Sequence, residues 1–150
     1  MTTSAPAGSS ASLSEKNKAV LRNLAERFNK KDMKGFEDIY APNVSYKGTG
    51  ELANADRTTF MEFVKAIVAA FPDARMKIDD VIAEADRVAY RMTFTGTHKQ
   101  DFMGITATNK KITVRSLGLA RIGDTRIIEE WENYDEMGMM RQLGVIPPAE

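Results

Sequence analysis

Apolar residues recur at helical spacing over the first half of the chain. In three segments they fall three or four positions apart, and in the first segment charged residues lie on the other positions. Together with capping residues and prolines, this spacing predicts three helices. They are one that begins at Ser12 or Ser14 and ends within residues 29–31, one capped by Asp32 and ended by Pro42, and one opened by Asn54 or Asp56 and ended by Pro72. Residues 43–47 form a short extended segment between the last two.

From Arg75 onward apolar and polar residues alternate, which is typical of strands that bury one face. Four strands are predicted, over residues 75–83, 88–95, 111–122 and 126–134. The residues expected to share one face are, strand by strand, Met76, Ile78, Asp80 and Ile82; Val88, Tyr90, Met92 and Phe94; Ile112, Val114, Ser116, Gly118, Ala120 and Ile122; and Ile128, Glu130, Glu132 and Tyr134.

Turn residues and a closing helix complete the pattern. Residues 84–87 and Gly123-Asp124 are predicted turns, and residues 96–109 form a longer connection. Asp135 is placed to cap a final short helix, and Gly144 is placed to end it.

The order of these elements is helices first, then a meander of long antiparallel strands, then one closing helix. This order predicts an α+β fold with its helices on one face of the sheet. A chain of 150 residues fits one domain, which we assign to residues 12–150. Residues 1–11 contain too little apolar surface to offset the entropy of ordering, so we expect a disordered tail there.

Composition narrows the classes of function. Lysine plus arginine balances aspartate plus glutamate, 21 each, so no global field attracts nucleic acid or an anionic membrane. The absence of cysteine excludes disulfides, thiol catalysis and cysteine-bound metals. The N-terminus does not have the pattern of a signal peptide, and no apolar run approaches the ~20 residues of a membrane span. We therefore expect a cytoplasmic protein with neither a nucleic-acid nor a membrane partner.

Small residues on one face of the strand over residues 111–122 point to a pocket. Ser116, Gly118 and Ala120 follow one another on that face, and small side chains there leave space between the sheet and the helices. The alternative is that large neighbours fill the space, or that Gly118 marks a bulge.

Glu132 is the candidate for acid/base chemistry. If its face of the last strand borders an apolar cavity, desolvation raises the pKa of the carboxyl group and makes it a general base or acid. The alternative is that the glutamates of this strand, which include Glu129 and Glu130, solvate an outer face of the sheet.

Other candidates for ligand contact are spread along the chain. Tyr46 and Lys47 lie on the short extended segment before a loop, and Tyr90 and Met92 share the inward face of their strand. His98 follows the same strand, with anchoring of the loop as its alternative role. Further along, Trp131 is either near the ligand or part of the core or of a subunit interface. A lone histidine is poor evidence for a metal ligand, and we assign no metal site.

Several segments resemble the SnoaL-like polyketide cyclases, also called ester cyclases. Residues 85–98 (ADRVAYRMTFTGTH) resemble the second long strand of that family. The pattern continues through residues 102–105, 110–114, 121–124 and 128–131, and residues 134–144 resemble the closing helix. The resemblance extends from about Glu15 to Gly144 and includes residues 40–43.

The resemblance implies a cone-shaped fold of the nuclear transport factor 2 superfamily, an α+β barrel. In such a fold a strongly curved, mostly antiparallel sheet is wrapped by N-terminal helices around a hydrophobic cavity, and subunits often pair as homodimers through their sheets. Cyclases of the family close a ring by aldol condensation, using no metal or organic cofactor. An acidic residue just after the last-strand tryptophan acts as acid and base, and here that position is Glu132.

Other family positions differ in this chain. The assisting histidine of the third long strand falls at Gly118, and the polar pair after the first short strand falls at Tyr46 and Lys47. His98 matches a residue common in the family.

Three hypotheses follow. The first is a polyketide or ester cyclase type of enzyme, in which Glu132 acts on an apolar carbonyl compound while Tyr46, Lys47 or Tyr90 stabilises the enolate oxygen. The second is a non-catalytic module that binds an apolar ligand or dimerises, which the glycine at position 118 favours. The third is an interaction protein that pairs through its sheet face.

Overall fold

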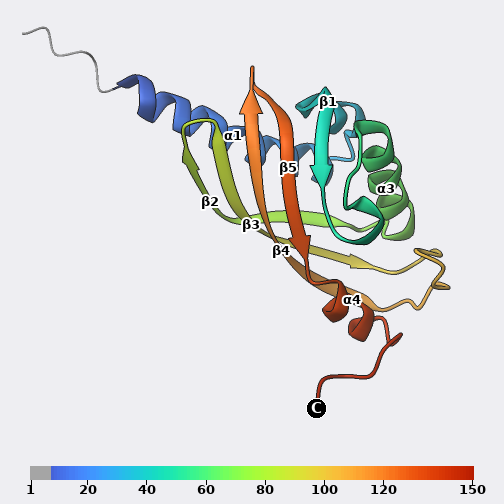
Figure 1. Cartoon of the computed structure of the whole chain (residues 1–150). Helices are drawn as coiled ribbons and strands as arrows, with labels where there is room; N and C mark the ends of the chain where they lie inside the picture. The colour runs from blue at the N-terminus through green and yellow to red at the C-terminus, as the bar shows by residue number, and fades with distance from the viewer. Residues whose placement is uncertain (1–7) are drawn as a thin grey trace, which may run out of the picture.

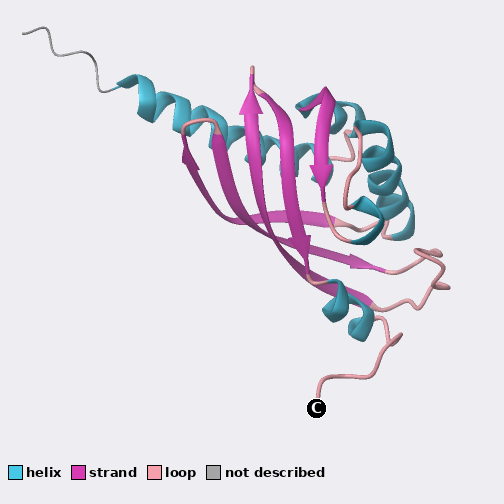
Figure 2. Cartoon of the chain, viewed as in Figure 1, coloured by secondary structure: helices cyan, strands magenta, loops and turns pink. Residues whose placement is uncertain are grey.

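A bent sheet flanked by helices forms the body of the molecule (Figures 1 and 2). The structure, a computed structural model, describes the backbone of residues 8–150 and the side chains from Leu13 onward. Its elements are, in chain order, α1 (Gly8–Asn29), α2 (Met33–Ile39), β1 (Tyr40–Lys47), a 3-10 turn (Gly50–Leu52), α3 (Arg57–Ala70), β2 (Arg75–Glu84), β3 (Arg87–Thr97), β4 (Lys111–Gly123), β5 (Arg126–Tyr134) and α4 (Glu136–Gln142).

The sheet has the strand order β1-β5-β4-β3-β2. The strands β2 to β5 form the predicted antiparallel meander, and β1 pairs with β5 in parallel. The long strands bend strongly along their length (Figure 1). This confirms the α+β class and the curved, mostly antiparallel sheet. The sheet itself is not closed, and β1 and β2 remain as its separate edges.

The helices form where the sequence places their caps. The carboxylates of Asp32, Asp56 and Asp135 each accept a hydrogen bond from the backbone N–H three residues later, which begins α2, α3 and α4. On the sheet, α1 packs against β2 and β3, and α3 packs against β1. The helices thereby cover the inner face of the sheet and leave its outer face uncovered within the described chain.

The first helix begins earlier than predicted. It starts at Gly8 rather than at Ser12, so residues 8–11 of the expected tail are helical. The sequence has no proline within residues 7–12 that would prevent the helix from beginning before Ser12. The rest of the expected tail, residues 1–7, lies outside the described residues.

Two register shifts correct the predicted faces of β2 and β5. Between Ile78 and Asp80 the pairing with β3 shifts, so the second half of β2 turns Val81 and Ala83 inward and leaves Ile82 67% exposed. A second shift, between Arg121 and Ile122 of β4, makes Ile127 the buried residue of β5 in place of Ile128. Alternation along a sequence does not reveal such bulges, because one extra residue reverses the faces that follow it.

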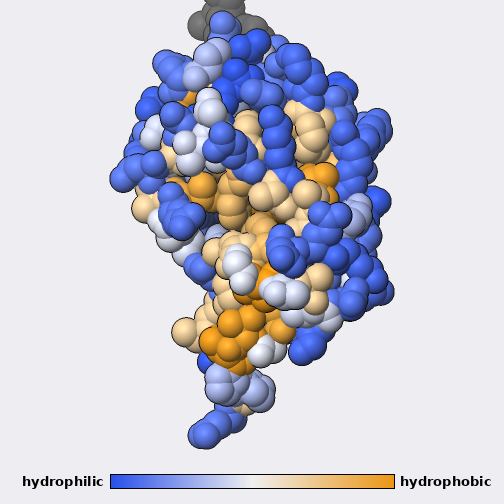
Figure 3. Space-filling view, turned by 90° about the vertical axis from the view of Figure 1, so that its right-hand side faces the viewer, coloured by the Kyte–Doolittle hydropathy of each residue, from blue (hydrophilic) through white to orange (hydrophobic). Residues whose placement is uncertain are grey.

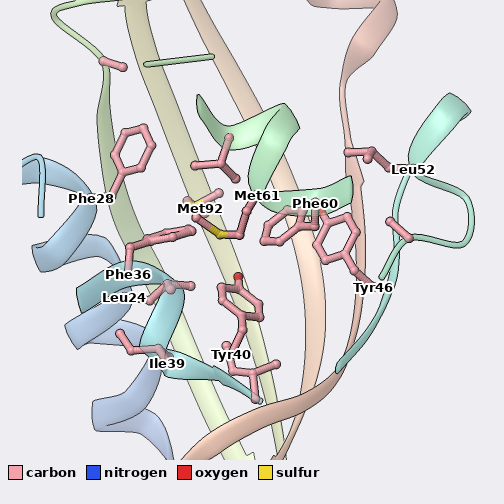
Figure 4. Close-up of a cluster of buried hydrophobic side chains, with 14 of the residues drawn as sticks. Leu24, Phe28, Phe36, Ile39, Tyr40, Tyr46, Leu52, Phe60, Met61 and Met92 are labelled. Carbon is pink, nitrogen blue, oxygen red and sulfur yellow. The ribbon is translucent and has the colours of Figure 1, made fainter. Parts of the chain in front are cut away.

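The core lies between the inner face of the sheet and α1, α2 and α3 (Figure 4). Aromatic rings link these layers: Phe28 contacts Phe36, which contacts Tyr40, which contacts Phe60. Within the described part of the chain, we find no helix with the length and apolar character needed to cross a bilayer.

Candidate functional site

A cavity of about 90 Å³ lies between α3 and the inner face of the sheet. Its walls are apolar except for four residues, which are Tyr46, Ser116, Glu132 and Tyr134. Residues of α3, β2, β3, β4 and α4 complete the lining, and Met92 is among them. Apolar surface gathers on the face of the molecule where α3, the loop after β3 and the C-terminal segment meet (Figure 3).

Glu132 is partly buried and borders this cavity. Its Oε2 accepts hydrogen bonds from two tyrosine hydroxyls, that of Tyr46 at 3.0 Å and that of Tyr90 at 3.2 Å. Because residues on one strand alternate between faces, Glu130 points to the same side as Glu132. Both carboxyl groups therefore face the covered side of the sheet rather than bulk water.

Gly118 allows Tyr90 to reach the two glutamates. The register places Tyr90 of β3, Gly118 of β4 and Glu132 of β5 side by side across the sheet. Position 118 has no side chain, so the Tyr90 ring lies across it, and a β-carbon there would overlap the ring and its hydroxyl. The space expected at Gly118 is thus filled by a large neighbour, and the cavity lies further along β4, at Ser116 and Val114.

Glu130 is the most deeply buried ionisable group near the cavity, with 1% of its surface exposed. Its Oε1 accepts a hydrogen bond of 2.5 Å from the Tyr90 hydroxyl, while its Oε2 has no hydrogen-bond partner among the described residues. A second cavity, of about 20 Å³, is bordered by both Glu130 and Glu132 and by the side chain of Tyr40.

Burial controls the charge of this cluster. Desolvation, followed by repulsion from the Glu132 carboxylate, raises the pKa of Glu130 to about 8, against hydrogen bonds that lower it. Desolvation also raises the pKa of Glu132, and the nearby hydroxyls of Ser116, Tyr46 and Tyr90 oppose that rise. Among the described residues no lysine or arginine borders either cavity. The glutamates therefore have no nearby cation to hold both of them ionised.

Packing fixes the direction of the Tyr46 hydroxyl. The Tyr46 ring stacks on Phe60 of α3, with centroids 4.0 Å apart and planes 20° from parallel (Figure 4). Its backbone pairs with Ala55 in an isolated bridge. This tyrosine is 4% exposed, and burial raises the pKa of its hydroxyl, so it remains a hydrogen-bond donor.

Ser116 presents an unused hydroxyl to the cavity. It is 5% exposed, it borders the cavity, and its Oγ lies close enough to Glu132 to lower the pKa of that carboxyl but makes no hydrogen bond of good geometry within the described chain. A buried hydroxyl without a partner is available to a bound molecule. Tyr134 also borders the cavity, and burial raises the pKa of its hydroxyl to about 12.

Lys47 and Trp131, expected near the ligand, lie on the other face of the sheet. The ammonium of Lys47 is 4.6 Å from the centroid of the Trp131 ring and 3.2 Å from a carboxylate oxygen of Glu129. They are paired neighbours on β1 and β5, each one residue away from an inward-facing residue. Alternation therefore removes both from the cavity.

His98 also lies away from the cavity lining. It is fully buried, stacks on Phe71 and contacts Thr108 through Nδ1, which lies 3.0 Å from the hydroxyl. Its backbone bonds to Lys110 and Asn109 hold the two ends of the loop together. The histidine thus anchors the loop, which is the alternative that the sequence left open. Within the described chain no group of acidic and histidine side chains is arranged to hold a metal ion.

Sequence reasoning did not single out Glu130 or Tyr40 as site residues. The signal for Glu130 was available, because it lies two residues before Glu132 on the same strand face. Tyr40 was assigned to the end of a helix, whereas it begins β1, with its hydroxyl pointing into the core (Figure 4).

Comparison with solved structures identifies close relatives in fold. AclR from Streptomyces galilaeus, provisionally assigned as a hydroxylase, superposes with a TM-score of 0.83 at 24% identity, covering 91% of this chain and 85% of its own. IdmH from Streptomyces antibioticus, provisionally assigned as a polyketide cyclase, gives a TM-score of 0.76 at 28% identity, covering 85% and 98%. A comparison with curated protein sequences gives no significant match.

A further neighbour defines the fold. A protein from Catenulispora acidiphila with a ketosteroid isomerase-like fold, solved in complex with trimethylamine, gives a TM-score of 0.70 at 14% identity over 83% of this chain and 92% of its own. The chain shares this α+β fold. Residues 18–143 match the family model of the SnoaL-like polyketide cyclases, and these residues include the whole cluster around Glu132. On this match, the chain belongs to the SnoaL-like polyketide cyclase family.

Proposed function

We propose that this chain binds an apolar carbonyl compound in the cavity and that Glu132 transfers a proton at the carbon next to the carbonyl group, as in a polyketide or ester cyclase. The observation that carries the proposal is a carboxyl group at the wall of an apolar cavity, hydrogen-bonded by two tyrosines. Membership of the family and the likeness to IdmH support this class of reaction.

The raised pKa of Glu132 suits proton transfer. Burial brings the pKa of its carboxyl closer to neutrality, where a group serves as base in one step and acid in the next. Abstraction of a proton next to a carbonyl produces an enolate, and its attack on a second carbonyl carbon of the same molecule closes a ring. The proton on Glu132 then passes to the new alkoxide oxygen, so the carboxylate is regenerated.

The enolate oxygen needs a hydrogen-bond donor, and Ser116 is the best placed. The hydroxyls of Tyr46 and Tyr90 are already directed at glutamates, and Lys47 lies on the other face. Ser116 Oγ borders the cavity and has no partner among the described side chains and backbone groups. A preformed donor of this kind in an apolar site is a main source of catalysis for such intermediates.

A second function is binding without catalysis. The family resemblance implies an assisting histidine where this chain has Gly118, and the Tyr90 ring now occupies that space. A chain that lost this partner would retain the apolar cavity and the ability to bind a ligand.

Hydrogen–deuterium exchange distinguishes the two functions with simple carbonyl compounds in place of the natural substrate. The wild-type protein is incubated in D₂O with a panel of aromatic ketones and 1,3-dicarbonyl compounds, and NMR follows deuterium entering next to the carbonyl. We expect catalysed exchange for at least one compound. Glu132→Gln should reduce the rate at least ~100-fold, which is the typical contribution of a general base.

Glu129→Gln is the matched control, because Glu129 is on the same strand with its side chain on the other face, beside Lys47 and Arg121. It should leave exchange unchanged. Equal rates in the Glu132→Gln variant and the wild type would exclude the proposed role of Glu132. If no compound exchanges but apolar compounds raise the melting temperature, the binding function is the correct one.

A further inference from the structure

Glu130 is a buried carboxyl group for which the proposed reaction has no use. It lies on β5 two residues before Glu132, and the Tyr90 hydroxyl contacts both side chains, at 2.5 Å to Glu130 Oε1 and 3.2 Å to Glu132 Oε2. Burial of a second carboxyl beside the first is costly unless a proton or a partner neutralises it.

The number of protons available limits how these contacts form. Tyr90 has one hydroxyl proton, and two ionised carboxylates are acceptors only. A hydroxyl between two ionised carboxylates must split its one proton between them, whereas a carboxyl that carries a proton can donate it to the phenol oxygen, so that both contacts become full hydrogen bonds. Two arrangements satisfy this condition. Glu132 is protonated and Tyr90 donates to Glu130, or Glu130 is protonated and Tyr90 donates to Glu132.

We infer that Glu130 and Glu132 share one proton through the Tyr90 hydroxyl, and that Glu130 is a positioning residue that stores this proton while Glu132 acts as a base. In the exchange, the proton on Glu132 Oε2 passes to the Tyr90 oxygen as the Tyr90 hydroxyl proton passes to Glu130 Oε1. The pair keeps one proton and one negative charge throughout. The catalytic use of this exchange rests on the proposed function of Glu132, whereas the sharing itself does not.

The surroundings favour one shared proton. The polar groups that face the pair are hydroxyls, from Tyr40 and Tyr46 on β1, Tyr90 on β3 and Ser116 on β4. The helices contribute apolar side chains, including Leu24, Phe36 and Phe60, to the lining of the small cavity that both glutamates border. With no cation among these residues, a second negative charge is disfavoured. The cavity of about 20 Å³ has room for one water to bond the free Oε2 of Glu130.

An NMR titration of the wild-type protein tests the inference directly. Glutamate labelled with ¹³C at Cδ reports the charge of each carboxyl group, and the signals are assigned with Glu130→Gln and Glu132→Gln. If the proton is shared, the Cδ signals of Glu130 and Glu132 each move in two steps at the same two pH values. If each signal moves in one step of its own, or if both groups are ionised at neutral pH, the inference is wrong.

Two variants identify Tyr90 as the bridge. Tyr90→Phe keeps the ring but removes the hydroxyl that stabilises the pair with one proton, so the two steps should lie closer together, although repulsion still couples the carboxyl groups. In Glu130→Gln the upper step, near pH 8, should be lost, and Glu132 should titrate once. Tyr134→Phe is the control, because Tyr134 lines the large cavity rather than the small cavity that both glutamates border, and it should preserve both steps. Two steps that are as widely separated in Tyr90→Phe as in the wild type would refute the bridge.

The two proposals fail separately. A protein that shows shared titration but no exchange of substrate protons lacks the proposed function and retains the proton pair. A protein that exchanges substrate protons through Glu132, while Glu130 titrates alone, retains the function and disproves the storage role of Glu130.

Discussion

Replacing Gly118 by alanine should disrupt the glutamate cluster without replacing any of its polar side chains. The backbone at this position is ordinary extended strand, so alanine is not strained there and would otherwise lower the entropy of the unfolded chain. However, the new methyl group would overlap the ring and hydroxyl of Tyr90, which lie directly over the glycine. The ring must therefore move, and its bonds to Glu130 and Glu132 are lost or lengthened.

The cost follows from two contributions. Forcing an extra methyl group into a packed interior costs about 1–3 kcal/mol. Losing a hydrogen bond to a charged partner costs about 1.5–3 kcal/mol, and Glu130 Oε1 is left buried with one partner fewer. We therefore expect Gly118→Ala to lower the free energy of unfolding by about 3 kcal/mol, a large part of the ~5–15 kcal/mol typical of a domain.

Urea denaturation followed through the fluorescence of Trp131, the single tryptophan, measures this effect. Met137→Ala is the control, because Met137 lies on α4 with 58% of its surface exposed and should change stability by no more than ~0.5 kcal/mol. Gly118→Ala should also cost under ~1 kcal/mol when Tyr90 is already alanine. A loss of the same size in both backgrounds would refute the explanation by overlap with Tyr90.

Three further predictions use other parts of the structure. The pKa of Glu130 rises on folding from 4.5 to about 8, so its contribution to stability is complete below about pH 4.5 and is lost as the pH rises through 8. Urea denaturation should therefore give a lower free energy of unfolding at pH 9 than at pH 5, by at most about 5 kcal/mol. The Glu130→Gln variant should not show this difference. Lys47→Ala should cost under ~1 kcal/mol and leave ligand binding unchanged in calorimetry, since its contacts to Trp131 and Glu129 lie outside the cavity; weaker binding would contradict this placement. The expected homodimer should be detected by sedimentation velocity at micromolar concentration. The Leu117→Glu variant, which places a charge on the uncovered face of the sheet, should be monomeric. A monomeric wild type would contradict this prediction.

Local signals were sufficient to predict most of the fold. Asp32, Asp56 and Asp135 begin helices as expected, because capping depends on neighbouring residues alone. Alternation along β3 and β4 identified their inner faces correctly, since neither strand is shifted against the other. The bulges in β2 and β5 were missed because they depend on how strands pair.

The site was less accessible to prediction. Glu132 borders the cavity as the hypothesis required, but the role of Gly118 could not be read from the sequence, because it depends on Tyr90 lying opposite in the register. Lys47 was placed beside Tyr46, yet adjacent residues of a strand face opposite ways. Glu130 was undervalued because a run of glutamates is usually solvated, and its hydrogen-bond partner, Tyr90, comes from another strand.

The parallel pairing of β1 with β5 has a consequence for biosynthesis. In the sheet β1 has one neighbour, β5, which is synthesised after the other four strands of the sheet. Early chain segments must therefore wait for late ones, a non-local arrangement that slows folding. Tyr46 meets Glu132 only when this final pairing forms, 86 positions apart along the chain. A nascent polypeptide that stalls before residue 126 would contain the sequences of α1 to α3 and of β1 to β4 but would lack Glu130 and Glu132, the two carboxyl groups of the cluster.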